Sequence, residues 1–101
     1  MLAEFSIVPL DKGVSLSDYV SEIVDKVDKS GIDYKLTPMG TVVEGEWDEV
    51  MDLISECHEE MRNYSDRIET KIIIDDRKDA KNRLSGKIES VEKKLGKEVN
   101  K

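Results

Sequence analysis

Two periodicities of apolar residues divide the chain into short segments. Alternation of apolar and polar residues predicts strands over residues 1–10, 32–37, 41–44 and 67–75. Apolar residues at helical spacing predict helices over residues 15–30, 47–64 and 79–95. Ser15 and Asp79 are the expected N-terminal caps of the first and last helices, and Gly31 is the expected stop of the first. The predicted order is therefore strand, helix, strand, strand, helix, strand, helix.

The first six of these segments follow the ferredoxin-like βαββαβ plan, an α+β sandwich. Right-handed crossovers put both main helices on one face of a four-stranded antiparallel sheet, with the first strand beside the third and the fourth. We expect a single domain over residues 1–96, including the extra C-terminal helix, and a frayed tail over 97–101. The last helix has a thin apolar stripe interrupted by Gly86, so its stability is expected to need a partner subunit.

The second predicted helix carries an apolar stripe at helical spacing. Its members are Trp47, Val50, Met51, Ile54, Cys57, Met61 and Tyr64. We expect this stripe to face the sheet and Trp47 to anchor the helix, although an aromatic side chain at this corner could also stack on a ligand.

The third strand can be set in two ways. Either Thr41 and Val43 lie beneath the helices, or Val42 and Glu44 do. We favour the setting with Glu44 outward, because a carboxylate in the helix-covered core would be costly.

The uncovered face of the sheet is then a mixture of apolar and polar side chains. Its expected members are Leu2, Glu4, Ser6, Val8, Val42, Glu44, Glu69, Lys71 and Ile73. Such a face is too apolar to stay hydrated in a monomer, so we expect a homodimer or homotetramer that packs sheet on sheet. Polar groups caught between the sheets must find partners or line a ligand pocket.

The composition and charge of the chain limit the kinds of molecule that it is expected to bind. The 101 residues carry a formal charge of −7, with 38% hydrophobic and 39% charged residues, and no basic patch with interleaved aromatics. Nucleic acid is therefore an unfavourable partner, whereas a cationic small ligand suits the charge. Cys57 is the single cysteine, which excludes an internal disulfide. No apolar run reaches membrane-spanning length and the N-terminus has no basic signal region, so we expect a cytoplasmic protein with no membrane partner.

The hairpin region between the second and third strands holds the most distinctive residues. Pro38-Met39-Gly40 forms the turn before Thr41, and Glu44-Gly45-Glu46 leads into the second helix. With Asp75-Asp76-Arg77 and a late Lys87 followed by Val91, these blocks resemble the small thiamine-binding family of ferredoxin-like proteins. The resemblance covers nearly the whole chain, and the blocks occur in the family's order and spacing.

The resemblance implies a non-catalytic oligomer that needs no cofactor and binds thiamine, or its hydroxymethylpyrimidine part, in a pocket between subunits. A cationic thiazolium favours carboxylates or π faces, and an aminopyrimidine needs donors, acceptors and a stacking surface. The candidate ligand-binding residues are Ser6, Thr37, Thr41, Glu44 and Lys71.

Four of the five candidates also have a purely structural explanation. Thr41 and Glu44 could pin the hairpin through backbone hydrogen bonds, and Ser6 could be a small polar residue in a dimer interface. Lys71 could belong to an interface ion pair. The segment 75–77 is either a structural loop or a ligand contact, and the sequence leaves both possibilities open.

Two other functional classes remain beside the binding protein. A regulatory module would use the open face to bind another protein. An acylphosphatase-like hydrolase would need an arginine and a phosphate-cradling loop after the first strand, where residues 9–13 supply neither. His58 lacks a second ligand at zinc spacing, and Cys57 on an apolar helix face is expected to be a core residue.

Overall fold

The computed structural model describes residues 1–13, 17–79 and 83–100. Its elements are β1 (Leu2–Pro9), α1 (Ser17–Ser30), β2 (Asp33–Thr37), β3 (Gly40–Glu44), α2 (Trp47–Arg62), β4 (Ile68–Asp75) and α3 (Arg83–Leu95). This order confirms the predicted succession of strands and helices. Ser15, the predicted cap of the first helix, lies outside the described part of the chain. So do residues 80–82, which follow Asp79, the predicted cap of the last helix.

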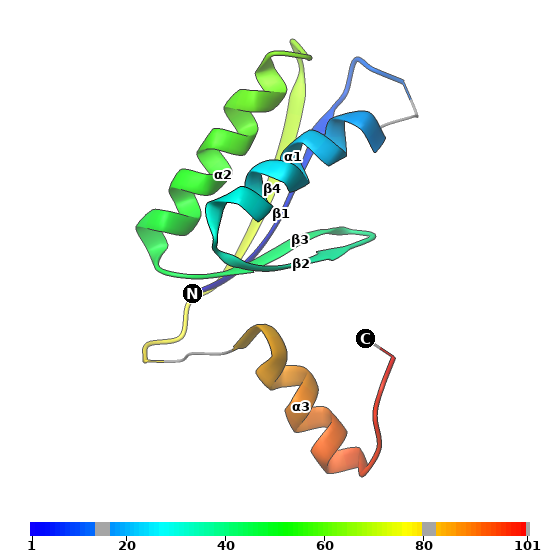
Figure 1. Ribbon diagram of the computed structural model, residues 1–101, viewed down its shortest axis with the longest axis vertical. Helices are drawn as coiled ribbons and strands as arrows, with labels where there is room; N and C mark the ends of the chain where they lie inside the picture. The colour runs from blue at the N-terminus through cyan, green and yellow to red at the C-terminus, as the bar shows by residue number, and fades with distance from the viewer. Residues whose placement is uncertain (14–16, 80–82, 101) are drawn as a thin grey trace.

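The four strands form one antiparallel sheet in the order β2-β3-β1-β4. Helices α1 and α2 lie side by side across one face of this sheet, and α3 lies apart from that layer, near the β2–β3 hairpin (Figure 1). The chain therefore has the predicted ferredoxin-like α+β fold with an additional C-terminal helix. None of the helices in the described residues is both long and apolar enough to cross a membrane.

The register of β3 against β1 settles which side chains lie beneath the helices. Ala3 pairs with Val43, and Phe5 pairs with Thr41. All four of these side chains are buried, with Thr41 only 5% exposed. Because side chains alternate along a strand, Glu44 belongs to the opposite face, which α1 and α2 leave uncovered. The predicted outward setting of Glu44 is confirmed.

The core is built from the helix-facing side of the sheet and the stripe of α2. Its buried apolar residues are Ala3, Phe5, Ile7, Ile23, Val27, Val43, Val50, Leu53, Ile54, Cys57 and Met61. Leu53, which the sequence reading left out of the stripe, is 3% exposed. Trp47 is 50% exposed, so the prediction that it belongs to the buried stripe was wrong. It is the first residue of α2, and the buried stripe begins one turn later at Val50.

Tyr64 is also outside the core. Helix α2 ends at Arg62, before Tyr64, and the tyrosine ring packs edge-on against Tyr19 of α1 with 5.7 Å between ring centres. Its side chain is 36% exposed, so Tyr64 bridges the two helices near the surface.

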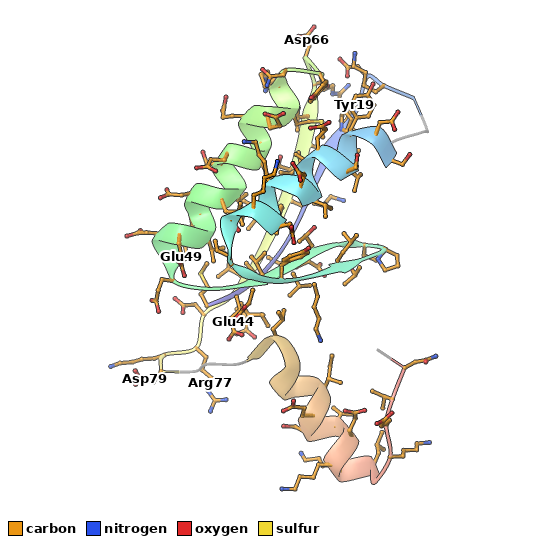
Figure 2. The ribbon with its side chains drawn as sticks, viewed as in Figure 1. Tyr19, Glu44, Glu49, Asp66, Arg77 and Asp79 are labelled. Carbon is orange, nitrogen blue, oxygen red and sulfur yellow. The ribbon has the colours of Figure 1, made fainter. Side chains whose placement is uncertain are left out.

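Helix α3 is attached to the sheet through a carboxylate. The backbone N–H of Leu84, in the first turn of α3, donates a 3.1 Å hydrogen bond to Oε1 of Glu44. A negative charge at a helix N-terminus interacts favourably with the helix dipole and satisfies an N–H that lacks a partner within the helix. Figure 2 shows Glu44 at the side of the sheet next to α3. Further along α3, Val91 and Leu95 are exposed.

Candidate functional site

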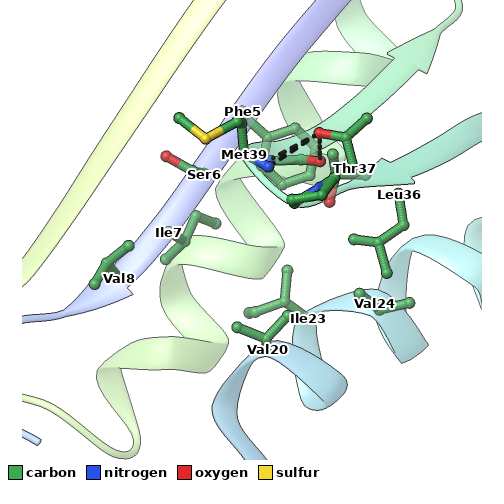
Figure 3. Close-up of a pocket in the computed structure, with 13 residues that line it drawn as sticks. Phe5, Ser6, Ile7, Val8, Val20, Ile23, Val24, Leu36, Thr37 and Met39 are labelled. Atoms are coloured by element: carbon green, nitrogen blue, oxygen red, sulfur yellow. Dashed lines mark hydrogen bonds between the residues drawn. The ribbon is translucent and has the colours of Figure 1, made fainter. Parts of the chain in front are cut away.

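An apolar cavity of about 240 Å³ lies between α1, the tip of the β2–β3 hairpin and the second half of β1. We call it the notch (Figure 3). Val20, Ile23 and Val24 of α1 form one wall, the hairpin segment 36–41 forms another, and the segment 5–8 of β1 forms the floor. The lining is mostly apolar, which suits a flat ring more than a strongly hydrated ligand.

The notch exists because the hairpin is shorter than the strand beside it. Strand β4 pairs with β1 over the whole of Leu2–Pro9, whereas β3 pairs with β1 only over Leu2–Phe5. The chain turns back at residues 37–40, so the second half of β1 has no neighbouring strand on that side. Helix α1 roofs the uncovered segment without filling it.

Thr37 holds the hairpin tip in place. Its hydroxyl donates to the carbonyl of Gly40 over 2.9 Å and accepts 3.2 Å hydrogen bonds from the N–H groups of Met39 and Gly40. Gly40 lies so close to β1 that a Cβ atom there would be 2.8 Å from the carbonyl oxygen of Phe5. Any larger residue at this position would push the tip away from β1.

The notch brings together three of the five predicted site residues, namely Ser6, Thr37 and Thr41. Their roles in its lining differ. The Thr37 hydroxyl is engaged within the turn, and Thr41 lies among the buried side chains beneath the helices. Ser6 sits at the border between the notch and the uncovered face, because it lines cavities on both sides.

On the uncovered face, Ser6 meets the fourth predicted residue, Lys71. The two are directly opposite in the β1–β4 register. With Glu4, Met39 and Ile73 they border a shallow depression of about 160 Å³, which we call the outer hollow. The ammonium of Lys71 also lies 3.4 Å from the carboxylate of Glu69, and both side chains are well exposed, so this ion pair stabilises the face little.

Glu4 also lines the uncovered face, although it is not among the five predicted site residues. It borders the outer hollow and also a second depression of about 260 Å³ that includes Asp75 and the apolar side chains of Leu2, Val42 and Ile73. Its position in the strand alternation was the available signal. A half-buried carboxylate between apolar side chains is suited to a cationic group.

Glu44, the fifth predicted residue, lies apart from the other four. It borders neither the notch nor the outer hollow, and its carboxylate binds the first turn of α3. Of the segment left open by the sequence, Asp75 is half-buried at the end of β4, whereas Asp76 and Arg77 are exposed.

The loop after β1 is organised around Asp11. Its carboxylate accepts a 2.5 Å hydrogen bond from the hydroxyl of Ser65, which is 3% exposed, and a 3.1 Å bond from the N–H of Asp66. The Ser65 hydrogen bond is the main reason that the pKa of Asp11 lies below its usual value. An acylphosphatase-like site would require N–H donors that cradle a phosphate here, and the negative charge of this carboxylate is unfavourable for that ligand.

Cys57 and His58 both make contacts within the fold. Burial raises the pKa of Cys57 to about 11, which keeps it a thiol at neutral pH. Nδ1 of His58 is 2.6 Å from the hydroxyl of Thr70, joining α2 to β4. In the part of the chain that the structure describes, no group of three or more His, Cys, Asp or Glu side chains could hold a metal ion.

A family model and several known proteins match this chain over most of its length. A family model described as thiamine-binding protein matches residues 3–92. UPF0045 protein MJ1052 of Methanocaldococcus jannaschii is 36% identical over 91 residues, covering 90% of this chain and 91% of its own. A UPF0045 protein of Methanothermobacter thermautotrophicus is 40% identical over 96 residues, covering 92% and 97%.

Two solved structures have the same fold as this chain. The crystal structure of MJ1052 has a TM-score of 0.83 at 37% identity and covers 89% of this chain and 93% of its own. A Thermotoga maritima protein named as a candidate in thiamine biosynthesis or salvage has a TM-score of 0.79 over 89% of this chain and 96% of its own. At 22% identity, that second likeness shows the fold alone.

Proposed function

This chain belongs to the thiamine-binding protein family, and we propose that it is a non-catalytic protein that binds thiamine or its hydroxymethylpyrimidine part in the notch. The observation that carries the proposal is the notch itself, an apolar slot beside a strand edge with Ser6 at its border. The name of the Thermotoga maritima protein of the same fold points to the same vitamin.

The size of the notch favours the pyrimidine half of the vitamin as its occupant. Its volume of about 240 Å³ lies just below the range of roughly 300–1,000 Å³ that is typical of pockets for drug-sized ligands. One substituted ring fills such a space, and the thiazolium half of thiamine would extend out of it. The adjoining outer hollow, which shares Ser6 and Met39 with the notch, offers the carboxylate of Glu4 to that cation.

We further propose that a second copy of the chain covers the uncovered face of the sheet. Ile73 is 66% exposed there, beside the half-buried side chains of Leu2, Val8 and Val42. Two such faces packed together would remove this apolar surface from water and roof the outer hollow. The ligand would then lie at a boundary between subunits.

Ligand binding is tested by calorimetry and thermal unfolding with hydroxymethylpyrimidine and with thiamine. A ligand present at 100 times its Kd stabilises the folded state by about 2.7 kcal/mol. For a domain of this size, each kcal/mol raises Tm by ~4–8 °C, so a rise of roughly 10–20 °C is expected. No rise with either compound at millimolar concentration would refute the proposal.

A pair of variants locates the ligand. Val20 lines the notch, whereas its neighbour Ser21 is exposed and does not. Val20→Trp should fill the cavity and abolish the rise in Tm, and Ser21→Trp should leave it unchanged. Equal binding by both variants would place the ligand elsewhere.

Self-association needs a separate measurement, since it does not depend on the ligand. Light scattering after size exclusion should give a mass of at least two chains. Ile73→Glu, on the uncovered face, should reduce it to one chain, whereas Ser55→Glu, on an exposed position of α2, should not. A monomeric parent protein at micromolar concentration would rule out this assembly.

A further inference from the structure

We propose that the backbone N–H and C=O of Ile7 form the hydrogen-bonding edge with which the notch selects an aminopyrimidine. The inference rests on the proposed function and adds the chemical group that recognises the ligand. It follows from the direction in which the backbone groups of alternate β1 residues point, from the place where the hairpin ends, and from the hydrogen-bonding groups of an aminopyrimidine.

The hydrogen bonds of β1 to its two neighbours show which way the backbone groups of each residue point. Met1 and Gly45 exchange hydrogen bonds in both directions, over 2.8 and 3.0 Å, at the β3 side. On the other side, the N–H of Leu10 donates to Arg67 over 2.8 Å in continuation of the β1–β4 ladder. In an antiparallel ladder the backbone groups of successive residues point to opposite sides. Odd-numbered residues of β1 therefore point theirs toward β3, and Ile7 is one of them.

Strand β3 offers Ile7 no partner. Ala3 and Phe5, the preceding odd residues, are in register with Val43 and Thr41, and the pairing stops there. Met39 would be the next residue in register, but its N–H donates to the hydroxyl of Thr37 inside the turn. The strand edge at Ile7 is thus left open by the geometry of the hairpin tip, and this edge forms part of the notch lining.

The position is well fixed and its surroundings are apolar. Ile7 is buried in the core, with 6% of the residue exposed, so its backbone cannot turn away. Val20, Val24 and Leu36 form the apolar walls around the opening (Figure 3). In such surroundings a hydrogen bond is stronger than in water, and a donor or acceptor that a ligand leaves unpaired is penalised.

An aminopyrimidine presents the complementary pattern. A residue in extended conformation holds its N–H and C=O side by side, pointing the same way. A ring nitrogen with an amino group on the adjacent carbon offers an acceptor and a donor at similar spacing. The ring nitrogen would accept from the N–H of Ile7, and the amino group would donate to its carbonyl. The aliphatic side chains would contact the ring faces.

The free protein provides the first test, which needs no ligand. Amide hydrogen exchange should be at least tenfold faster at Ile7 than at Ala3 and Phe5, which point to the same side and are paired with β3. Equal protection at all three amides would mean that the edge is already occupied, and it would overturn the proposal.

The second test uses two matched ligands. Binding of 4-amino-2-methylpyrimidine should shift the amide resonance of Ile7 downfield and slow its exchange, leaving Ala3 unchanged. Replacing the amino group by methyl, in 2,4-dimethylpyrimidine, removes the donor and should weaken binding about 5- to 100-fold. If hydroxymethylpyrimidine binds but Ile7 does not respond, this inference fails and the proposed function stands. If no pyrimidine binds, both fail.

Discussion

Removing the carboxylate of Glu44 should loosen α3 without affecting the ligand. Its Oε1 accepts a 3.1 Å bond from the N–H of Leu84. Loss of a side-chain cap costs about 0.5–2 kcal/mol, and the interaction of a charge with the helix dipole adds about 0.3–1 kcal/mol. Taking about 1–2 kcal/mol for Glu44→Ala, amide exchange at Leu84 should accelerate roughly 5- to 30-fold.

Hydrogen exchange followed by NMR measures this effect residue by residue. Glu44→Gln is the matched control, because its amide oxygen can still accept a hydrogen bond but carries no charge, so it should show about half the effect. Exchange at Val43, in the middle of the sheet, should change little in either variant. Unchanged exchange at Leu84 in Glu44→Ala would refute the reasoning.

The same variants decide between two roles for Glu44. The sequence places it among the ligand-binding candidates, whereas the structure has it bordering neither the notch nor the outer hollow. We therefore expect the affinity for hydroxymethylpyrimidine to stay within about twofold of the parent value, since distant sites act independently. A loss of binding in Glu44→Gln, with α3 still docked, would restore its role in recognition.

Three further predictions concern stability and reactivity. Met61 is fully buried, so Met61→Ala should lower the free energy of unfolding by about 2–5 kcal/mol in urea titrations, whereas Met39→Ala, at an 81% exposed position, should change it by less than about 0.5 kcal/mol. The pKa of Asp11 is lower in the folded state than its usual 3.8, chiefly because of Ser65, so its stabilising contribution is complete above that value and is lost as the pH falls through the folded-state pKa. Asp11→Asn should therefore be less stable than the parent at pH 7 and should lose less stability on acidification to pH 2; parallel curves would contradict this. Cys57 is fully buried with a pKa of about 11, so iodoacetamide should modify it only under unfolding conditions, and rapid alkylation of the native protein would show that the core opens.

Much of the fold was predictable because its signals are local. The alternation of Ala3, Phe5 and Ile7 defines a strand with one buried face, and the apolar spacing from Val50 to Met61 defines a helix that packs on it. These patterns lie within a few residues of one another, so neither needs knowledge of the rest of the chain. The overestimated burial of Trp47 shows the limit of this approach, since periodicity cannot tell whether a neighbouring element covers the first turn of a helix.

The sequence by itself determined the family, the element order and the presence of an uncovered sheet face. Only the tertiary structure decided how the predicted site residues are distributed: Ser6, Thr37 and Thr41 around the notch, Lys71 beside Ser6 at the outer hollow, and Glu44 at the start of α3. The physical reason is that a site formed where one strand outruns its neighbour depends on register. Register arises from contacts between residues far apart in the chain, which no local pattern encodes.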